Sequence, residues 1–178
     1  MATAAQPLLT TVEQYRRLPE RDDAVQELHW GQVITVTRPK ARHVKLESHL
    51  VRLLRPKAEP LGYVESELPF RALPEYDLRA ADVAFVSRER WDSVEDDDDL
   101  RGAPELVIEV LSRSNTPARL RETAALCLAA GTQEFWVVDP KRQTISVTTR
   151  DGATVVYARE DRIPLSLFGG ELAVADVF

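Results

Sequence analysis

The feature that most constrains the fold is a nearly uninterrupted apolar run at residues 105–111, ELVIEVL. A strand that is apolar on both faces is typical of the centre of a sheet that is covered on both sides. After this run, Asn115 or Thr116 can cap a helix that begins at Pro117. The sequence EFWVVDP at residues 134–140 then predicts a second strand. A buried strand, a helix and another strand in this order predict a βαβ crossover and a mixed α/β fold.

Hydrophobic periodicity predicts the elements on either side of this unit. Four leucines between residues 42 and 55 have the spacing of one helix face, and we expect Pro56 and Pro60 to end that helix. The other predicted elements are a short helix near residues 11–18, a hairpin at 25–37, strands at 63–69 and 78–87, and a hairpin at 144–158. The sequence therefore predicts a mixed sheet flanked by helices, with an extra amino-terminal hairpin and a carboxyl-terminal hairpin.

Length and composition predict one domain that spans residues 1–178. The chain has 178 residues, 44% of them apolar, and no repeat or Gly/Ser linker divides it. Its single cysteine, Cys127, can form no intramolecular disulfide, and no Cys/His cluster suits structural zinc, so a reducing, cytoplasmic compartment is expected. The sequence has neither a secretory signal pattern nor the roughly 20 apolar residues that span a bilayer. We therefore expect neither export nor a membrane location.

Charge is unevenly distributed along the chain. The formal net charge is −6, from 23 Lys and Arg and 29 Asp and Glu, but five of the acids adjoin one another at residues 95–99. This acidic run is predicted to be a solvated loop, and without it 23 basic residues face 24 acidic ones. Residues 38–57 instead carry seven Lys and Arg against Glu47 alone. Such a region can bind phosphates, although a helix with ordinary solvated charges is the preferred interpretation of this feature taken alone.

Two acidic residues beside apolar strand sequences form the candidate site. Glu109 lies within ELVIEVL, where a carboxylate is costly to desolvate unless it is paired, metal-bound or protonated. Asp82 precedes the apolar residues 83–86 of the neighbouring predicted strand. Carboxylates on adjacent strands, about 5 Å apart across the ladder, can share Mg2+ or Mn2+, which polarises a phosphoryl oxygen and lowers the pKa of water. The alternative is that Glu109 lies at an exposed edge or pairs with an arginine.

Several local sequences carry a resemblance to a known family. They are TVEQYRRLPE, QELHWGQVI, a helix that begins near His43, RAADVAFVS, PELVIEVLSRSNT, LAAGTQEFWVVDP and IPLSLFGGELAVADVF. In these sequences the chain resembles the small prokaryotic putative restriction endonucleases of the PD-(D/E)XK nuclease superfamily. The resemblance covers nearly the whole chain, and the block from EVLS to WVVDP is its most specific part. It implies a restriction-endonuclease-like αβββαβ core and hydrolysis of DNA with Mg2+ or Mn2+ held by Asp82 and Glu109.

The chain departs from this family at the catalytic lysine. In the superfamily a lysine follows the glutamate by two residues, but that position is Leu111 here. The family moves the lysine to the following helix, at the position of Thr123, with a tyrosine at the position of Cys127. The resemblance therefore implies weakened catalysis, because the loss of one electrostatic donor can cost about 100-fold or more. Arg119 or Arg121 could partly replace the lysine by stabilising charge, although a guanidinium is a poor base.

Other residues match recurring positions of the family. Glu27, in QELHWGQ, is a candidate third metal ligand. His43 is a candidate for the cleft, although an interaction with Glu47 one helical turn later is the simpler interpretation. Contact with nucleic acid is assigned to Lys40, Arg42, His43 and Lys45.

The sequence leaves three functions open. The first is a metal-dependent DNA endonuclease. The second is a catalytically degenerate domain that keeps the nuclease fold to bind nucleic acid or a protein, and Thr123 favours it. The third is a structural or interaction protein in which Glu109 is a paired core acid. A homodimer is expected from the resemblance and from an exposed apolar tail, Leu172, Val174, Val177 and Phe178, although that tail can equally pack on its own domain.

Overall fold

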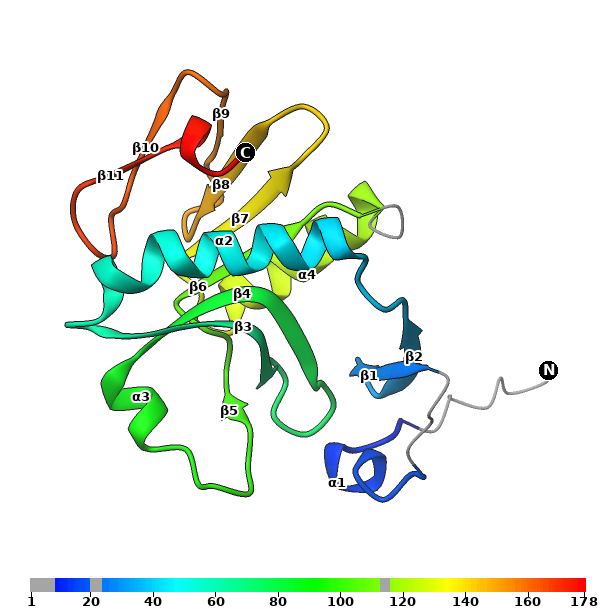
Figure 1. Cartoon of the computed structure of the whole chain (residues 1–178). Helices are drawn as coiled ribbons and strands as arrows, with labels where there is room; N and C mark the ends of the chain where they lie inside the picture. Colours follow the sequence, from blue (N-terminus) through cyan, green and yellow to red (C-terminus); the bar gives the residue numbers. More distant parts are fainter. Residues whose placement is uncertain (1–8, 20–23, 113–115) are drawn as a thin grey trace.

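The computed structural model describes residues 9–19, 24–112 and 116–178, and a seven-stranded mixed sheet forms its centre (Figure 1). The strands lie in the order β5-β3-β4-β6-β7-β8-β9. Their bounds are β3 Gly62–Arg71, β4 Arg79–Ser87, β5 Leu100–Arg101, β6 Leu106–Val110, β7 Glu134–Asp139, β8 Thr144–Thr149 and β9 Thr154–Tyr157. Two antiparallel pairs lie outside this sheet, β1 Val25–His29 with β2 Gln32–Val36 and β10 Arg162–Pro164 with β11 Glu171–Ala173. The helices are α1 Val12–Tyr15, α2 Ala41–Ala58, α3 Arg88–Asp92, α4 Pro117–Ala129 and a 3-10 helix, η1 Val174–Asp176.

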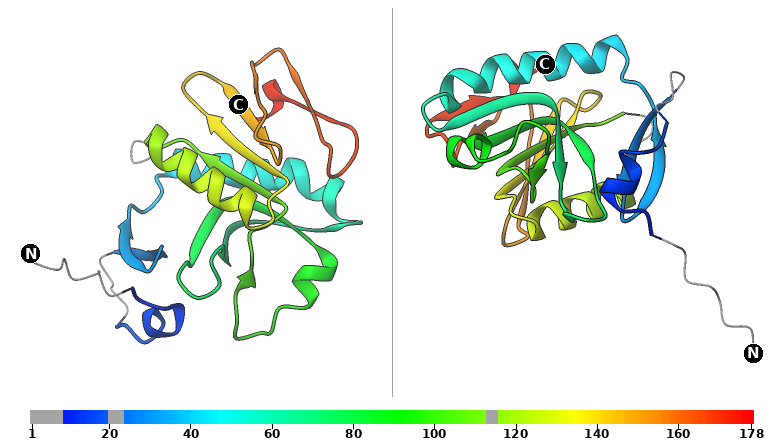
Figure 2. Two further views of the ribbon diagram at one scale, coloured as in Figure 1. Left: turned by 180° about the vertical axis from the view of Figure 1, so that it is seen from behind. Right: turned by 90° about the horizontal axis from the view of Figure 1, so that it is seen from below.

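Helices α2 and α4 cover opposite faces of the sheet (Figure 2). On the α2 face, Leu50 and Leu54 pack with strand residues such as Trp136. On the α4 face, Cys127 packs with Phe135 and its neighbours. Burial of these apolar surfaces fixes the two helices against the sheet. In the described part of the chain, no helix is long and apolar enough to cross a membrane.

The predicted βαβ unit is present in the structure. Strands β6 and β7 are parallel neighbours joined through α4. Thr116 caps this helix, since its Oγ1 accepts a hydrogen bond from the amide of Arg119 at 3.3 Å. Pro117 occupies the first turn, where a missing N–H costs no helical hydrogen bond. With α2, β3 and β4, the unit completes the αβββαβ core, and the predicted fold class is confirmed.

One local prediction, the end of helix α2, was wrong. Helix α2 continues to Ala58, so Pro56 lies inside its last turn. A proline there removes one hydrogen bond, which the packed apolar face of the helix outweighs. The acidic run is an exposed loop at Glu95, Asp96 and Asp97, as predicted, while Asp98 forms ion pairs of 3.0 and 2.9 Å with Arg71 and Arg101. These ion pairs tie the run to β3 and β5.

The apolar carboxyl terminus is buried. Leu172, Val174 and Val177 are each at most 3% exposed, and they pack in the core on the α2 face. Phe178 is partly buried against the same core. The interpretation of this segment as an exposed tail was therefore wrong, because its apolar surface is covered within its own chain. The homodimer stays a prediction without this support.

The β1–β2 hairpin is joined to the beginning of β4. Leu28 and Leu78 exchange two backbone hydrogen bonds, of 2.8 and 2.9 Å, in an isolated bridge. Gly31, at the turn of the hairpin, has a φ of +74°, and its amide donates to the carbonyl of Tyr76 at 2.6 Å. These contacts bring Glu27 next to β4, where the candidate site begins.

Candidate active site

Asp82 lies where strands β4 and β6 separate. The antiparallel pairing of the two strands ends at Val83 opposite Ile108. The next residue in this register is Asp82 on β4 and Glu109 on β6. Instead of a further backbone pair, Asp82 Oδ2 accepts a hydrogen bond from the Val110 amide at 2.6 Å. The two carboxylates predicted from the sequence therefore come from neighbouring positions of adjacent strands.

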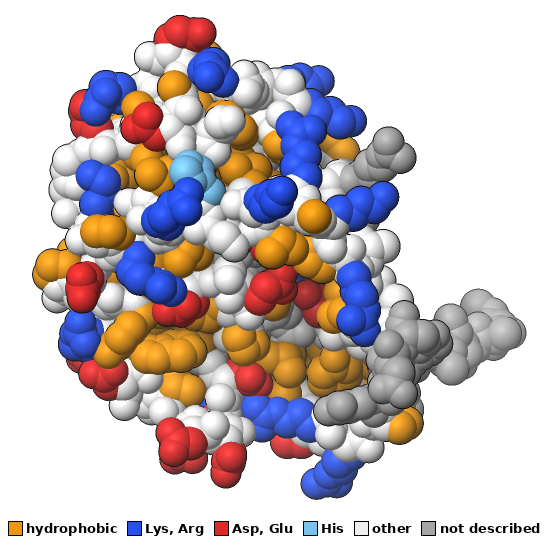
Figure 3. Space-filling model, viewed as in Figure 1, with side chains coloured by type: hydrophobic (Ala, Val, Ile, Leu, Met, Phe, Trp, Pro, Cys, Tyr) orange, Lys and Arg blue, Asp and Glu red, His pale blue; other side chains and the backbone are white. Residues whose placement is uncertain are grey.

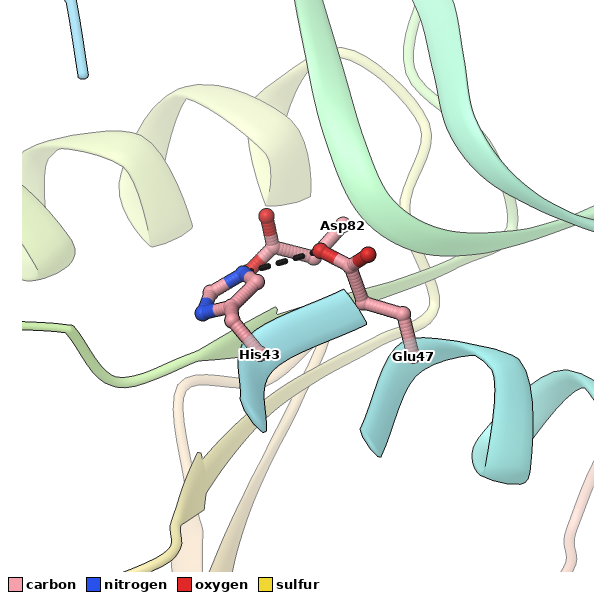
Figure 4. Close-up of side chains that lie close together, drawn as sticks. All are labelled: His43, Glu47 and Asp82. Atoms are coloured by element: carbon pink, nitrogen blue, oxygen red, sulfur yellow. Dashed lines mark ion pairs between the residues drawn. The ribbon is translucent and has the colours of Figure 1, made fainter. Parts of the chain in front are cut away.

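The beginning of α2 brings two further side chains to Asp82 (Figure 4). His43 Nε2 lies 2.8 Å from Glu47 Oε1 and 3.2 Å from Asp82 Oδ2. Ligand atoms of all three residues lie within 4.8 Å of one another. The contact with Asp82, and then that with Glu47, raises the pKa of His43 to about 10. The expected interaction between His43 and Glu47 is thus present, and Asp82 shares the same imidazole.

Glu109 is partly buried, and its pKa lies well above the ordinary value. Desolvation is the main cause, and repulsion from Asp82 and Glu27 adds to it. The positive charges of Arg79 and His43 act in the opposite direction. A carboxyl group that is withdrawn from water beside other acids is typical of catalytic and metal-binding sites.

Two other glutamates, on β1 and β3, interact electrostatically with the acids of this region. Glu27 accepts a backbone hydrogen bond from β4 at 3.4 Å, and its Oε2 lies 2.5 Å from His29 Nε2. Glu67 has a φ of +51° and interrupts the β3–β4 pairing opposite Asp82, although the register continues on both sides. Glu67 is exposed overall, but partial desolvation of its carboxyl group raises its pKa to about 7, and repulsion from Glu47 is the next cause. A strained backbone conformation beside a group of acids is typical of functional sites.

Of the acids in this region, Glu47 and Asp82 have ligand atoms close enough for one metal ion in the described part of the chain, and the other three interact with them electrostatically. We call Glu27, Glu47, Glu67, Asp82 and Glu109 the carboxylate cluster. Glu47 is 2% exposed, and its Oε1 contacts His43 without a well-aligned hydrogen bond in the described part of the chain. Protonated His43 is the cation beside this oxygen, and it also faces Asp82. Carboxylate oxygens are suitable ligands for Mg2+ or Mn2+, so Asp82 and Glu47 would fit the expected ion in the place of the imidazolium, which cannot be a ligand while it is protonated.

Comparison with known proteins identifies the family of this chain and a structure with the same fold. The chain matches the model of the Uma2 family, described as putative restriction endonuclease, over residues 12–175. The chain belongs to the Uma2 family. It is also similar to a crystal structure described as a putative nuclease belonging to DUF820 from Anabaena variabilis, with 23% identity and a TM-score of 0.80 over 94% of this chain and 97% of that chain. That likeness supports the fold, and no curated protein matches the chain.

In this Uma2 chain, the helix position expected for lysine contacts a different cation from those predicted. Thr123 Oγ1 accepts a hydrogen bond from Arg79 Nη1 at 3.3 Å. Arg119 and Arg121 are both exposed on α4. Their predicted role as substitutes for the lysine stays a prediction, and Arg79 is the arginine that acts most strongly on Glu109.

The basic residues assigned to nucleic acid lie near the cluster. Lys40, Arg42 and Lys45 are exposed at the beginning of α2, close in the chain to His43. Arg42 also donates to the carbonyl of Pro140 at 2.9 Å. Figure 3 shows Lys and Arg side chains across the face that α2 covers, with acidic side chains among them. Basic groups beside carboxylates suit an anionic backbone that must approach a metal site, and these contacts stay predictions.

The sequence did not place Glu47, Glu67 or Arg79 among the candidate site residues, and in the structure Glu47 and Glu67 lie beside Asp82 while Arg79 contacts Thr123. Glu47 had a signal, because it is the only acid among residues 38–57 and lies one helical turn after His43. Glu67 had no such sequence signal, because the positive φ that distinguishes it belongs to a local distortion of β3 that the sequence pattern does not predict. Arg79 likewise depends on a contact between β4 and α4, which are far apart in the sequence.

Proposed function

We propose that this chain is a divalent-metal-dependent endonuclease that hydrolyses DNA phosphodiester bonds. The observation that carries the proposal is the convergence of Asp82 and Glu109 from adjacent strands, with buried Glu47 added from α2. Membership of the Uma2 family supports the same class of reaction. In this proposal Asp82 and Glu109 hold Mg2+ or Mn2+, and Glu47 is a further ligand.

The metal ion supplies the polarisation of a phosphoryl oxygen and a lowered pKa of water when it is bound. The chain itself supplies orientation. The Val110 amide and His43 both contact Asp82 Oδ2, so that carboxylate is held in one position. Exposed Lys40 and Lys45 attract the phosphate backbone from the α2 side.

Calorimetric titration with Mn2+ and Mg2+ tests the metal site. We expect binding in the wild-type protein that is lost in Glu109→Ala. Glu65→Ala is the matched control, because Glu65 lies on β3 but is exposed and pairs with Arg55 at 2.7 Å. With plasmid DNA and Mn2+, Glu109→Ala is expected to lower the cleavage rate by about 100-fold or more, while the control keeps it. Equal metal binding in wild type and Glu109→Ala, even with DNA present, would contradict the proposal.

A catalytically degenerate DNA-binding domain is the second candidate function. The uncharged Thr123 at the expected lysine position favours it. Fluorescence anisotropy with labelled duplex DNA separates the two functions. The degenerate domain binds DNA equally in wild type and Glu109→Ala and cleaves it in neither, whereas the endonuclease cleaves it only when Glu109 is present.

A further inference from the structure

A groove lies between α2, the turn that joins β7 to β8, and residues 177–178. Its volume is about 270 Å³, close to the lower end of the range for ligand pockets. Arg42 and Lys45 supply positive charge to it, and Leu46, Pro140 and Phe178 supply apolar surface. None of the described residues that line it is acidic. We call it the α2 groove, and its lining suits a ligand with an anionic part and an apolar part.

Hydrogen bonds hold the walls of the α2 groove in place. Arg42 Nη2 donates to the Pro140 carbonyl at 2.9 Å, which joins α2 to the β7–β8 turn. The Asp139 carboxylate accepts from two backbone amides of that turn, at 2.9 and 3.1 Å. On the remaining side, His49 Nε2 donates to the Asp176 carbonyl at 2.6 Å. A groove that is already formed costs a ligand little ordering of the protein.

The α2 groove lies at the same edge of the sheet as the candidate active site. Strands β6 and β7 are parallel, and Glu109 on β6 is paired with Val137 on β7. Carboxyl ends of neighbouring parallel strands meet at one edge, where α/β sheets bind their ligands. Pro140, in the groove, directly follows the last residue of β7. A nucleic-acid strand that reaches the carboxylate cluster can therefore continue into the groove one strand further along the sheet.

Basic side chains follow one side of α2. Arg42, Lys45 and Arg52 are all exposed, and their spacings of three and seven residues place them on the same side of the helix. Glu47, the only acid of this helix, is buried and faces His43 instead. The exposed side of α2 along the groove is therefore positive, which is the charge that attracts a phosphate backbone.

We propose that the α2 groove binds one unpaired nucleotide of a DNA strand, with its phosphate on Arg42 and Lys45 and its base on Leu46 and Phe178. This inference deepens the endonuclease function proposed above, on which the choice of DNA rests. Cationic side chains beside an aromatic ring are the usual means of binding single-stranded nucleic acid. A base inside a duplex is stacked and paired, so it presents no free face to a groove of this size. The preferred substrate is therefore DNA that is single-stranded next to the bond that is cleaved.

Fluorescence anisotropy with a labelled single-stranded oligonucleotide of about 12 nucleotides tests the groove. The buffer contains a chelator, so the result depends on neither metal binding nor cleavage. Lys45→Gln removes one charge from the groove. Lys57→Gln is the matched control, because Lys57 is an exposed lysine of the same helix that does not line the groove. The duplex of the same sequence and an abasic oligonucleotide of the same length are the comparison probes, and urea unfolding checks that both variants fold.

Loss of one phosphate contact has a defined salt signature. In about 0.1 M salt, Lys45→Gln is expected to bind the single strand about 5-fold more weakly than wild type. The slope of log affinity against log salt concentration is expected to decrease by about 0.7. Lys57→Gln is expected to keep both values. The abasic oligonucleotide is expected to bind wild type about 5-fold more weakly or less still, because the contact with a base is lost. The duplex is expected to bind more weakly than the single strand.

Each result decides the inference. Equal binding of the single strand by wild type and Lys45→Gln, or an equal loss in Lys57→Gln, would overturn the groove as the binding site. Equal binding of single strand and duplex, or of the abasic oligonucleotide, would overturn the contact with an unpaired base. Metal binding that depends on Glu109 would leave the proposed endonuclease function intact in all these cases. Conversely, Lys45-dependent binding of the single strand without Glu109-dependent Mn2+ binding would support the groove and overturn the endonuclease.

Discussion

At the scale of single residues, the charge of the site depends on how far each carboxyl group is withdrawn from water. The pKa of Glu67 is about 7 in the folded protein, above its ordinary value of 4.5, because burial and neighbouring acids disfavour the charged form. The folded state therefore binds more protons than the unfolded state between these values. The stabilising contribution of protonated Glu67 is complete below the unfolded pKa and is lost as the pH rises through about 7.

Substitution of Glu67 by glutamine removes this pH dependence. At about pH 8, Glu67→Gln is expected to be more stable than wild type by about 1 kcal/mol, a value reduced for solvent screening at this exposed side chain. At about pH 4 the difference is expected to vanish, because Glu67 is then protonated in both states. Urea unfolding in a buffer with a chelator measures both values. The same difference at the two pH values would show that Glu67 is not the titrating group.

Single residues also show what the sequence could predict of the site. Asp82 and Glu109 were predictable, because each is an acid beside or within an apolar strand. We expected the two acids to lie close together because their predicted strands are neighbours. In the structure, Asp82 and Glu109 are the next positions after the last paired residues of β4 and β6. The contact of Arg79 with Thr123 was not predictable, because it joins β4 to α4, which are far apart in the sequence. Local pattern thus identifies acids that are costly to bury, but not contacts between distant elements.

At the scale of elements, hydrophobic periodicity predicted the helices and strands that bury an apolar face in the core. Helices α2 and α4 and strands β3, β4, β6 and β7 were all predicted, because each packs a regular apolar pattern. Helix α3, with five residues, and strand β5, with two, were not predicted, because such short segments show no hydrophobic periodicity. Ion pairs such as that of Asp98 with Arg71 stabilise this region, and those partners lie far apart in the sequence.

The cap of α4 gives a prediction at this scale. Thr116→Ala removes the hydroxyl that accepts from the Arg119 amide, and it is expected to lower the free energy of unfolding by about 1 kcal/mol. Thr116→Ser keeps a hydroxyl at this position, so we expect it to lower the free energy of unfolding by only a small part of that amount. Urea unfolding compares the three proteins. A loss as large in Thr116→Ser as in Thr116→Ala would show that the threonine methyl group, not the cap, is responsible.

At the scale of the whole molecule, the carboxyl terminus completes the core beneath α2. Chain order alone could not decide between packing on its own domain and exposure, since apolar residues near a terminus serve either purpose. The structure has Val174 and Val177 in the same core as Leu50 and Leu54, so the final residues close one face of the sheet. The segment therefore gives no support to the predicted homodimer, which rests on the family resemblance alone.

A pair of matched valine substitutions tests this arrangement. Val177 is 2% exposed, and Val177→Ala is expected to lower the free energy of unfolding by about 2 kcal/mol, because it leaves a cavity in the core. Val156, on β9, is 60% exposed, and Val156→Ala is expected to cost at most about 0.5 kcal/mol. Neither variant is expected to change the mass measured by light scattering. A change of mass in Val177→Ala without a loss of stability would instead assign this residue to a contact between chains, because a core residue cannot be truncated without cost.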